Sequence, residues 1–325
     1  MNLKSIYERV FCSSGWRVAY RYIDQKEKKG ALPAVGQKYQ YHVVEMPKGY
    51  WAADPFLLTH KGETYLFIEY TDMKKKKAVL AQKRMLPTES EVEIIYEFPG
   101  HTSYPCVFEH RGKLYMIPET GANNTVELFQ CDVWPNRWSK KCNLVENMAT
   151  ADCTPFVYNH QLWIAIYQIQ KKSKKRILLI GKLDVERGVV SELREAVVYD
   201  DILGRPGGHF IYSENGDVVR VVQPGNHYYG EKLEFYRVVI DELGNYSEEK
   251  IGQFEPNQIQ LDKKYDFIGT HTFNRENNIE VIDVLLNKHF NILRPFKTCL
   301  QMMGIFGYGC YDRDRKYRDQ SWMNK

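Results

Sequence analysis

Residues 51–69, WAADPFLLTHKGETYLFIE, decide the fold. Two short apolar runs, at 56–59 and 64–68, flank the turn HKGE, which is typical of a β-hairpin. Because a hairpin brings the start of its first strand beside the end of its second, Asp54 and Glu69 are expected side by side. Two carboxylates at the end of an apolar hairpin are costly unless they are solvated or used, so this end is the place to look for a site.

The same pattern returns along most of the chain, at residues 103–119 (SYPCVFEHRGKLYMIPE) and 152–167 (DCTPFVYNHQLWIAIY), and in looser form at 205–223 (RPGGHFIYSENGDVVRVVQ) and 269–283 (GTHTFNRENNIEVID). Hairpin repeats of roughly 40–50 residues are typical of a β-propeller. The sequence therefore predicts an all-β, five-bladed β-propeller. Aligning the copies on their first proline predicts four prolines at equivalent positions around the axis: Pro55, Pro105, Pro155 and Pro206.

The repeats divide the 325 residues into an N-terminal arm at 1–15, a five-bladed propeller at 16–287 and a C-terminal tail at 288–325. The alternating sequence WRVAYRY at 16–22 is expected to close the ring by joining the last blade. The tail contains FKTCLQMMGIFGY followed by DRDRKYRD. It is interpreted either as a closing helix packed on the propeller or as a basic amphipathic segment that makes a peripheral membrane contact.

Charge and cysteine content exclude several classes of protein. A formal net charge of +4 gives no general argument for binding nucleic acid. The seven cysteines have neither metal-ligand nor redox spacing, so no metal ion and no cofactor are expected. Unpaired cysteines, a start without a long apolar run and no stretch resembling a membrane span together predict a cytoplasmic protein with reduced thiols.

The hairpin argument also predicts which residues face the funnel at one end of the propeller axis. The carboxylates among them are Asp54, Glu69, Glu119, Asp152 and Asp283. The other polar residues are Tyr104, Tyr167, Gln168, Arg205, His209, Gln223, Thr270 and His271. Carboxylates for acid–base or nucleophilic work, together with cations, amides and hydroxyls, are what a sugar site uses. Nearby aromatic residues that could stack on a sugar ring are Tyr50, Trp51 and Tyr104.

These residues also have structural interpretations, which the sequence leaves open. Asp54 and Asp152 could cap turns. Glu69 and Glu119 could form structural ion pairs with Arg205 at the axis. Three further histidines lie at the distal turns of three different blades and are expected to be surface residues rather than a metal site: His60, His110 and His160.

Several stretches taken together carry a family resemblance: WAADPFL, YLFIE, SYPCVFEHRGKLYMIPET, the W-x-x-x-W region near Trp134, DCTPFVYNHQLW, RPGGHF, YGEKLEFYRV and GTHTFN-VID. On these residues the chain resembles the five-bladed propellers of the arabinanase, levansucrase and invertase superfamily. It resembles more closely the N-terminal domain of the plant glucosamine inositolphosphorylceramide transferase and its bacterial relatives. The resemblance covers about residues 16–284.

The superfamily resemblance implies a catalytic acid in each of the first three blades. By position, Asp54 matches the base or nucleophile of blade one. The second acid falls at Tyr104, with Glu119 available on the adjacent strand. The third, a Glu in the superfamily, falls near Asp152, a shorter carboxylate. The plant relative also carries a separate transferase domain that this sequence does not show, so its activity is not expected to carry over unchanged.

The leading hypothesis is a carbohydrate-active enzyme that acts at a glycosidic bond, by transfer to a sugar or lipid acceptor or to water, in surface polysaccharide or glycolipid biosynthesis. Asp54 would be base or nucleophile, and Glu119 or Asp152 the proton donor. The residues expected to position the substrate are Glu69, Tyr104, Arg205, His209, Gln223 and His271. The expected partners are a sugar or glycan and an activated sugar donor.

Two other classes of function remain open. One is a non-catalytic glycan-binding propeller that assists a partner glycosyltransferase. The other is a protein-interaction propeller, which the cluster of funnel carboxylates argues against.

Overall fold

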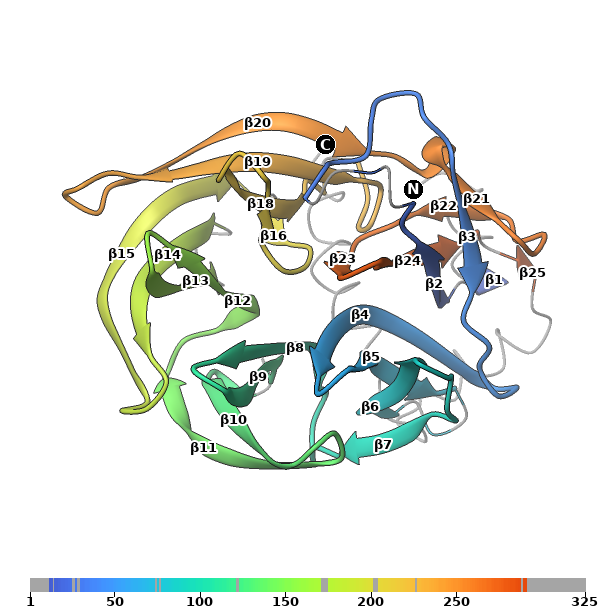
Figure 1. Cartoon of the computed structure of the whole chain (residues 1–325), viewed down its shortest axis with the longest axis horizontal. Coiled ribbons are helices and arrows are strands. Elements are labelled where there is room, and N and C mark those ends of the chain that lie inside the picture. The colour runs from blue at the N-terminus through green and yellow to red at the C-terminus, as the bar shows by residue number, and fades with distance from the viewer. Residues whose placement is uncertain are drawn as a thin grey trace, which may run out of the picture.

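The computed structural model describes residues 12–290, except 14, 25, 26, 28, 29, 74, 76, 121, 122, 171–174, 201–203, 226 and 288. These residues form five multi-stranded sheets around one axis (Figure 1). The predicted all-β, five-bladed propeller is therefore confirmed. Both interpretations of the tail concern residues outside the described part of the chain. No helix among the described residues is long and apolar enough to cross a membrane.

The first three blades are four-stranded antiparallel meanders in chain order. Blade one consists of β4 (Tyr50–His60), β5 (Glu63–Asp72), β6 (Lys77–Leu86) and β7 (Glu93–Tyr96). Blade two consists of β8 (Ser103–His110), β9 (Lys113–Glu119), β10 (Val126–Val133) and β11 (Arg137–Val145). Blade three consists of β12 (Thr150–Tyr158), β13 (Gln161–Ile169), β14 (Lys175–Asp184) and β15 (Val189–Asp200).

The last two blades are less regular. In blade four the innermost strand is split in two, giving β16 (Arg205–Pro206), β17 (Ile211–Tyr212), β18 (Val218–Gln223), β19 (Leu233–Ile240) and β20 (Tyr246–Phe254). Blade five combines β22 (Phe267–Gly269), β23 (Phe273–Glu276) and β24 (Ile279–Leu286) with β2 (Trp16–Tyr22), β3 (Tyr39–Val43) and β21 (Ile259–Leu261). Beside them β1 (Cys12–Ser13) pairs with β25 (His289–Phe290).

The N-terminal strand closes the ring, as the sequence predicts. β2 pairs with β24 along its whole length, from Trp16 opposite Leu285 to Tyr22 opposite Ile279. In Figure 1 the blue β2 lies beside the orange-red β24, so the two ends of the propeller sequence share one blade. Because blade five needs both ends, the contacts between blade five and blade one depend on this closure.

The core lies between neighbouring blades, whose sheets pack face to face. Strand β5 is buried at eight consecutive positions, since both faces of its sheet are covered. Between blades one and two, Phe56 and Phe67 pack with Phe129, and all three are fully buried. Each such side chain stabilises the fold by about 1.5–3 kcal/mol relative to leaving it exposed.

A bulge interrupts the innermost strand at the same place in the first three blades. The register shifts between Ala53 and Phe56, between Ser103 and Cys106, and between Ala151 and Thr154. The first residue of each bulge has a left-handed backbone: Asp54 (φ 49°), Tyr104 (φ 48°) and Asp152 (φ 51°). A bulge redirects side chains, and these three residues share the bulge position near the start of the innermost strand of their blade.

These bulges correct the predicted proline alignment. Cys153, not Pro155, takes the position of Pro55 and Pro105, because Pro155 pairs with Ile164 beyond the bulge. Pro206 lies in the short β16, opposite Val222. The bulge and the distal turn set the register, and proline does not.

Candidate functional site

The three bulge residues define the funnel end of the axis. A left-handed backbone is uncommon for residues other than glycine, and for a bulky residue such as Tyr104 it is a clear outlier. Strained backbones of this kind concentrate at functional sites. Asp54 and Asp152, which are 5% and 1% exposed, share this position in blades one and three. These two carboxylates are therefore the centres of the candidate site.

The Asp54 carboxylate is fully engaged by neighbouring blades. Its Oδ1 lies 3.0 Å from Nε2 of His271 and accepts a 3.2 Å hydrogen bond from the hydroxyl of Thr272. Its Oδ2 accepts a 3.1 Å hydrogen bond from the backbone N–H of Tyr104. Blades one, two and five therefore meet at Asp54.

Asp283 of β24 also belongs to this group. Its Oδ2 lies 2.9 Å from Nδ1 of His271 and accepts a 3.1 Å hydrogen bond from the N–H of Asp54. Its Oδ1 accepts 3.0 Å hydrogen bonds from the N–H groups of His271 and Thr272. The imidazole of His271 therefore lies between two buried carboxylates.

This arrangement favours the ionised forms of Asp54 and His271. Burial by itself lowers the pKa of His271, but the charges and hydrogen bonds of Asp283 and Asp54 outweigh it and raise that pKa to about 10. Burial by itself raises the pKa of Asp54, but the hydrogen bond and charge of His271, with the charge of Arg205, bring it below the ordinary value. At neutral pH the group is an imidazolium between carboxylates.

Asp54, His271 and Asp283 are also the only described residues whose His, Cys, Asp or Glu ligand atoms gather as closely as a metal ion would require, within 4.8 Å of one another. However, both ring nitrogens of His271 already face carboxylates. A metal ion would have to displace the proton that the raised pKa of His271 favours. The donor set therefore fits a protonated ion triad better than a metal centre.

Asp152, at the equivalent bulge, has a different cation. Arg205 contacts Asp152 through Nε and through Nη2, whose distance to Oδ1 is 3.0 Å, and its Nη2 lies 2.8 Å from Oε2 of Glu119. Nε2 of Gln223 donates to Asp152 Oδ2 at 3.3 Å. The predicted alternative of an ion pair between Glu119 and Arg205 is therefore confirmed. Arg205 therefore pairs with both acids that were predicted as the proton donor.

The aromatic residues beside these charges were missed from the sequence. The ring of Trp16 lies 4.0 Å from that of His271, centroid to centroid. The ring of Tyr229 lies 5.0 Å from His271, and its centroid is 5.5 Å from the guanidinium carbon of Arg205. Tyr229 thus touches both halves of the funnel. The available signal for Trp16 was the predicted ring closure. Tyr229 lies in a loop, and its signal was the stretch YGEKLEFYRV that carries the family resemblance and begins at Tyr229.

Of the aromatic residues predicted to stack on sugar, Tyr50 and Tyr104 make structural contacts, whereas Trp51 packs in one cluster with Trp16 and Tyr229. Tyr104 is fully buried, and its hydroxyl accepts a 3.0 Å hydrogen bond from the N–H of Gly208. Trp51 is buried, and Tyr50 stacks on Tyr70 with centroids 4.7 Å apart. Of these residues, only the backbone of Tyr104 reaches Asp54.

Two other predicted binding residues have mainly structural contacts. Nε2 of His209 lies 2.8 Å from the carbonyl oxygen of Val107, and burial lowers the His209 pKa to about 4. Glu69 pairs with Ala53 across the hairpin, directly before the bulge, and accepts a 3.3 Å hydrogen bond from Thr71. The predicted proximity of the hairpin ends is therefore correct, although Glu69 points to a different partner from Asp54.

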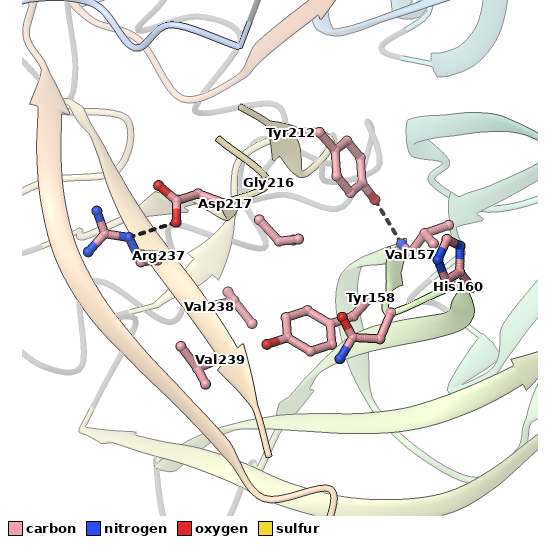
Figure 2. A pocket seen from close by; sticks show the side chains of 11 residues that line it. Val157, Tyr158, His160, Tyr212, Gly216, Asp217, Arg237, Val238 and Val239 are labelled. Atoms are coloured by element: carbon pink, nitrogen blue, oxygen red, sulfur yellow. Dashed lines mark hydrogen bonds and ion pairs between the residues drawn. The ribbon is translucent and has the colours of Figure 1, made fainter. Parts of the chain in front are cut away.

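A shallow pocket of about 500 Å³ lies away from the funnel, where the distal turn of blade three meets blade four. Figure 2 shows Tyr158, His160 and Tyr212 on one side and the ion pair between Asp217 and Arg237, 3.2 Å long, on the other. None of the residues predicted for the funnel lines it. The candidate site is therefore defined by the charge clusters around Asp54 and Asp152 and not by this pocket.

Comparison with known proteins gives one family match. The family described as "Glucosamine inositolphosphorylceramide transferase 1, N-terminal" matches residues 40–283. Two curated relatives, both named glucosamine inositolphosphorylceramide transferase 1, come from Oryza sativa subsp. indica and subsp. japonica. Each is 24% identical over 195 residues, which span 58% of this chain and only 26% of the relative. The chain thus matches about a quarter of the length of these relatives.

Solved structures show the same architecture. An α-L-arabinofuranosidase from Podospora anserina, solved with cellotriose, has a TM-score of 0.53 at 10% identity and covers 86% of this chain and 98% of its own. A β-xylosidase has a TM-score of 0.52 at 9% identity and covers 74% and 93%. At such low identity these likenesses show the propeller fold alone.

Proposed function

This chain belongs to the glucosamine inositolphosphorylceramide transferase 1 N-terminal family, and from that premise we propose that its funnel binds a sugar or glycan. The observation that carries the proposal is the pair of charge clusters at equivalent bulges: Asp54 with His271, and Asp152 with Arg205. Both are fixed before any ligand arrives. Preorganised carboxylates and cations accept and donate hydrogen bonds to sugar hydroxyls at low entropic cost.

Binding in support of a partner glycosyltransferase suits this geometry better than catalysis by the propeller itself. Glycosidic bond cleavage needs one protonated carboxyl as general acid beside a second, ionised carboxylate. Both acids predicted as that proton donor, Glu119 and Asp152, are instead ion-paired with Arg205. We therefore favour a propeller that holds the glycan while a partner enzyme transfers sugar from an activated donor.

Catalysis at a glycosidic bond is the second candidate, and Asp54 is the observation that favours it. Its lowered pKa leaves an ionised carboxylate, the form that a nucleophile or general base requires. In that case the general acid would have to come from the substrate, the partner or another funnel group.

The charge balance bears on the class of sugar. The funnel groups identified above include the carboxylates Asp54, Glu69, Glu119, Asp152 and Asp283, against the cations Arg205 and His271. An acid-rich site attracts neutral or cationic ligands and repels anionic ones. The rice relatives are named for glucosamine, an amino sugar. We therefore propose a neutral or amino sugar rather than a sugar acid.

Calorimetric titration of the protein with glucosamine, N-acetylglucosamine and glucuronate, free and within oligosaccharides, tests this proposal. Saturable binding of the first two, and weaker binding of glucuronate, is the expected result. A parallel assay for turnover of labelled nucleotide sugars separates the two candidates. Release or transfer of label by the propeller alone would favour catalysis, and absence of all binding would contradict both.

We also propose a cytoplasmic setting in surface polysaccharide or glycolipid biosynthesis. The support is chemical: within the described part of the chain Cys106, Cys131, Cys142 and Cys153 are all free thiols. Mass spectrometry of alkylated native protein should find every cysteine reduced. A native disulfide would argue against this setting.

A further inference from the structure

We propose that Asp283 is a positioning residue that fixes the Asp54 carboxylate, through the imidazole of His271 and through the Asp54 backbone. The inference rests on the proposed sugar-binding role of Asp54 and deepens it. Asp283 is completely buried, so it acts on a ligand only through other groups. Its contacts affect Asp54 by two routes, one through the Asp54 backbone and one through His271.

The first route is the backbone. A left-handed conformation costs an L-residue roughly 1–2 kcal/mol. At Asp54 this conformation is held by the hydrogen bond from its N–H to Asp283 Oδ2. The bond crosses from blade one to blade five, so Asp283 determines how the bulge lies relative to the axis.

The second route is the charge on His271. The groups facing this imidazole are Asp54 from blade one, Asp283 from blade five, Trp16 from the closing strand and Tyr229 from the loop after β18. Only the two carboxylates favour the imidazolium, while burial opposes it. Removing the charge of Asp283 therefore leaves burial opposed by Asp54 alone, and we expect His271 to be neutral near neutral pH.

Loss of that proton would change Asp54 directly. A neutral imidazole carries a proton on one nitrogen only. Nε2 can then donate a hydrogen bond to Asp54 Oδ1 only in the tautomer that is protonated at Nε2. The carboxylate then keeps the hydrogen bonds from Thr272 and from the Tyr104 amide but loses its cation. Asp283 also pairs with Val18 of β2, so closure of the ring and alignment of Asp54 share one residue.

The test is NMR of the full-length protein labelled on histidine, with the His271 signals assigned from His271→Gln. At about pH 7.5 wild-type His271 is expected to be an imidazolium, well outside the ordinary titration range of histidine. In Asp283→Asn it is expected to be neutral. Asp152→Asn, which alters the equivalent bulge of blade three, is the matched control and should leave His271 protonated.

Glycan affinity gives the second readout. Asp283→Asn is expected to bind at least ~10-fold more weakly at about pH 7.5 and to recover affinity at about pH 5.5, where His271 can be protonated again. A purely structural role would weaken binding at both pH values. A folded Asp283→Asn protein with protonated His271 would overturn the proposal. If that variant does not fold, the wild-type spectrum decides, because a neutral His271 there also overturns it.

The two readouts separate this inference from the proposed function. If the wild-type protein binds no glycan but the His271 signals change as expected, the proposed function fails while Asp283 is still shown to set the charge beside Asp54. If glycan binds and Asp283→Asn leaves both affinity and the His271 signals unchanged, only the positioning role fails.

Discussion

The two sides of the funnel use the same backbone and different cations. Asp54 and Asp152 both begin a bulge, both have φ near 50°, and both are buried. Asp54 shares an imidazolium with Asp283, whereas Asp152 shares a guanidinium with Glu119. A guanidinium keeps its charge at any pH that the protein survives, but an imidazolium can lose its proton. One side is therefore permanently paired and the other can titrate.

The difference shows how a repeat fold becomes asymmetric. The repeat supplies the position of each carboxylate, and a neighbouring blade supplies its partner. Arg205 comes from blade four and His271 from the segment before β23 in blade five. Because both cations cross between blades, the funnel is complete only when the ring is closed.

The permanently paired side should be the more costly to disrupt. Arg205→Ala leaves Asp152 and Glu119 without their cation, and breaking a buried ion pair by removing one partner typically costs about 3–5 kcal/mol. Urea unfolding should show a loss of this size. The matched control is Lys182→Ala, because the exposed pair of Lys182 with Glu192 should contribute about 1 kcal/mol or less. Equal losses for the two variants would contradict the account.

The titratable side should make stability depend on pH. The pKa of His271 in the folded protein, about 10, lies above the ordinary value near 6.5. Its stabilisation is therefore fully present below about pH 6.5 and is lost as the pH rises through about 10. Wild-type protein should be more stable than His271→Gln at about pH 6, and this advantage should shrink by a few kcal/mol towards pH 10. An advantage that stays constant with pH would mean that His271 is not protonated.

The smallest expected effect concerns the third bulge residue. Tyr104→Phe leaves the N–H of Gly208 without its acceptor, at a cost of about 1–3 kcal/mol. Glycan affinity should not change, since Tyr104 is fully buried and its hydroxyl bonds Thr154 and the backbone of Gly208. Tyr212→Phe is the control: its hydroxyl also accepts a backbone N–H, from Val157, but Tyr212 is 44% exposed and water can replace it. A fall in glycan affinity for Tyr104→Phe would return Tyr104 to the binding residues.

The fold could be predicted from sequence because hairpin repeats are local. Turn residues and apolar runs recur at each blade, and the alternation at 16–22 predicted ring closure. The register within the repeat was less certain, because Pro155 resembles Pro55 and Pro105 in sequence while the bulge in blade three begins at Asp152. Because side chains alternate between the two faces of a strand, a shift of two residues keeps the apolar side chains on the same face.

The site was predictable only as a set of residues. Hairpin geometry placed Asp54, Asp152, Arg205 and His271 at one end, but it could not assign partners across the axis. Which cation meets which carboxylate depends on contacts between residues more than 50 positions apart. Tyr229 was missed as a funnel residue for the same reason: it begins the family-like stretch YGEKLEFYRV, but its loop has no periodic pattern that places it at the axis.

The most direct test of the account is glycan binding to wild-type protein, Asp54→Asn and Asp152→Asn, measured by calorimetry with the sugar that binds wild type best. Both variants keep the shape of the side chain and remove one funnel charge. The account predicts saturable binding by wild-type protein that is lost or strongly weakened in Asp54→Asn, with circular dichroism showing an unchanged fold. Undiminished binding by a folded Asp54→Asn protein would contradict it.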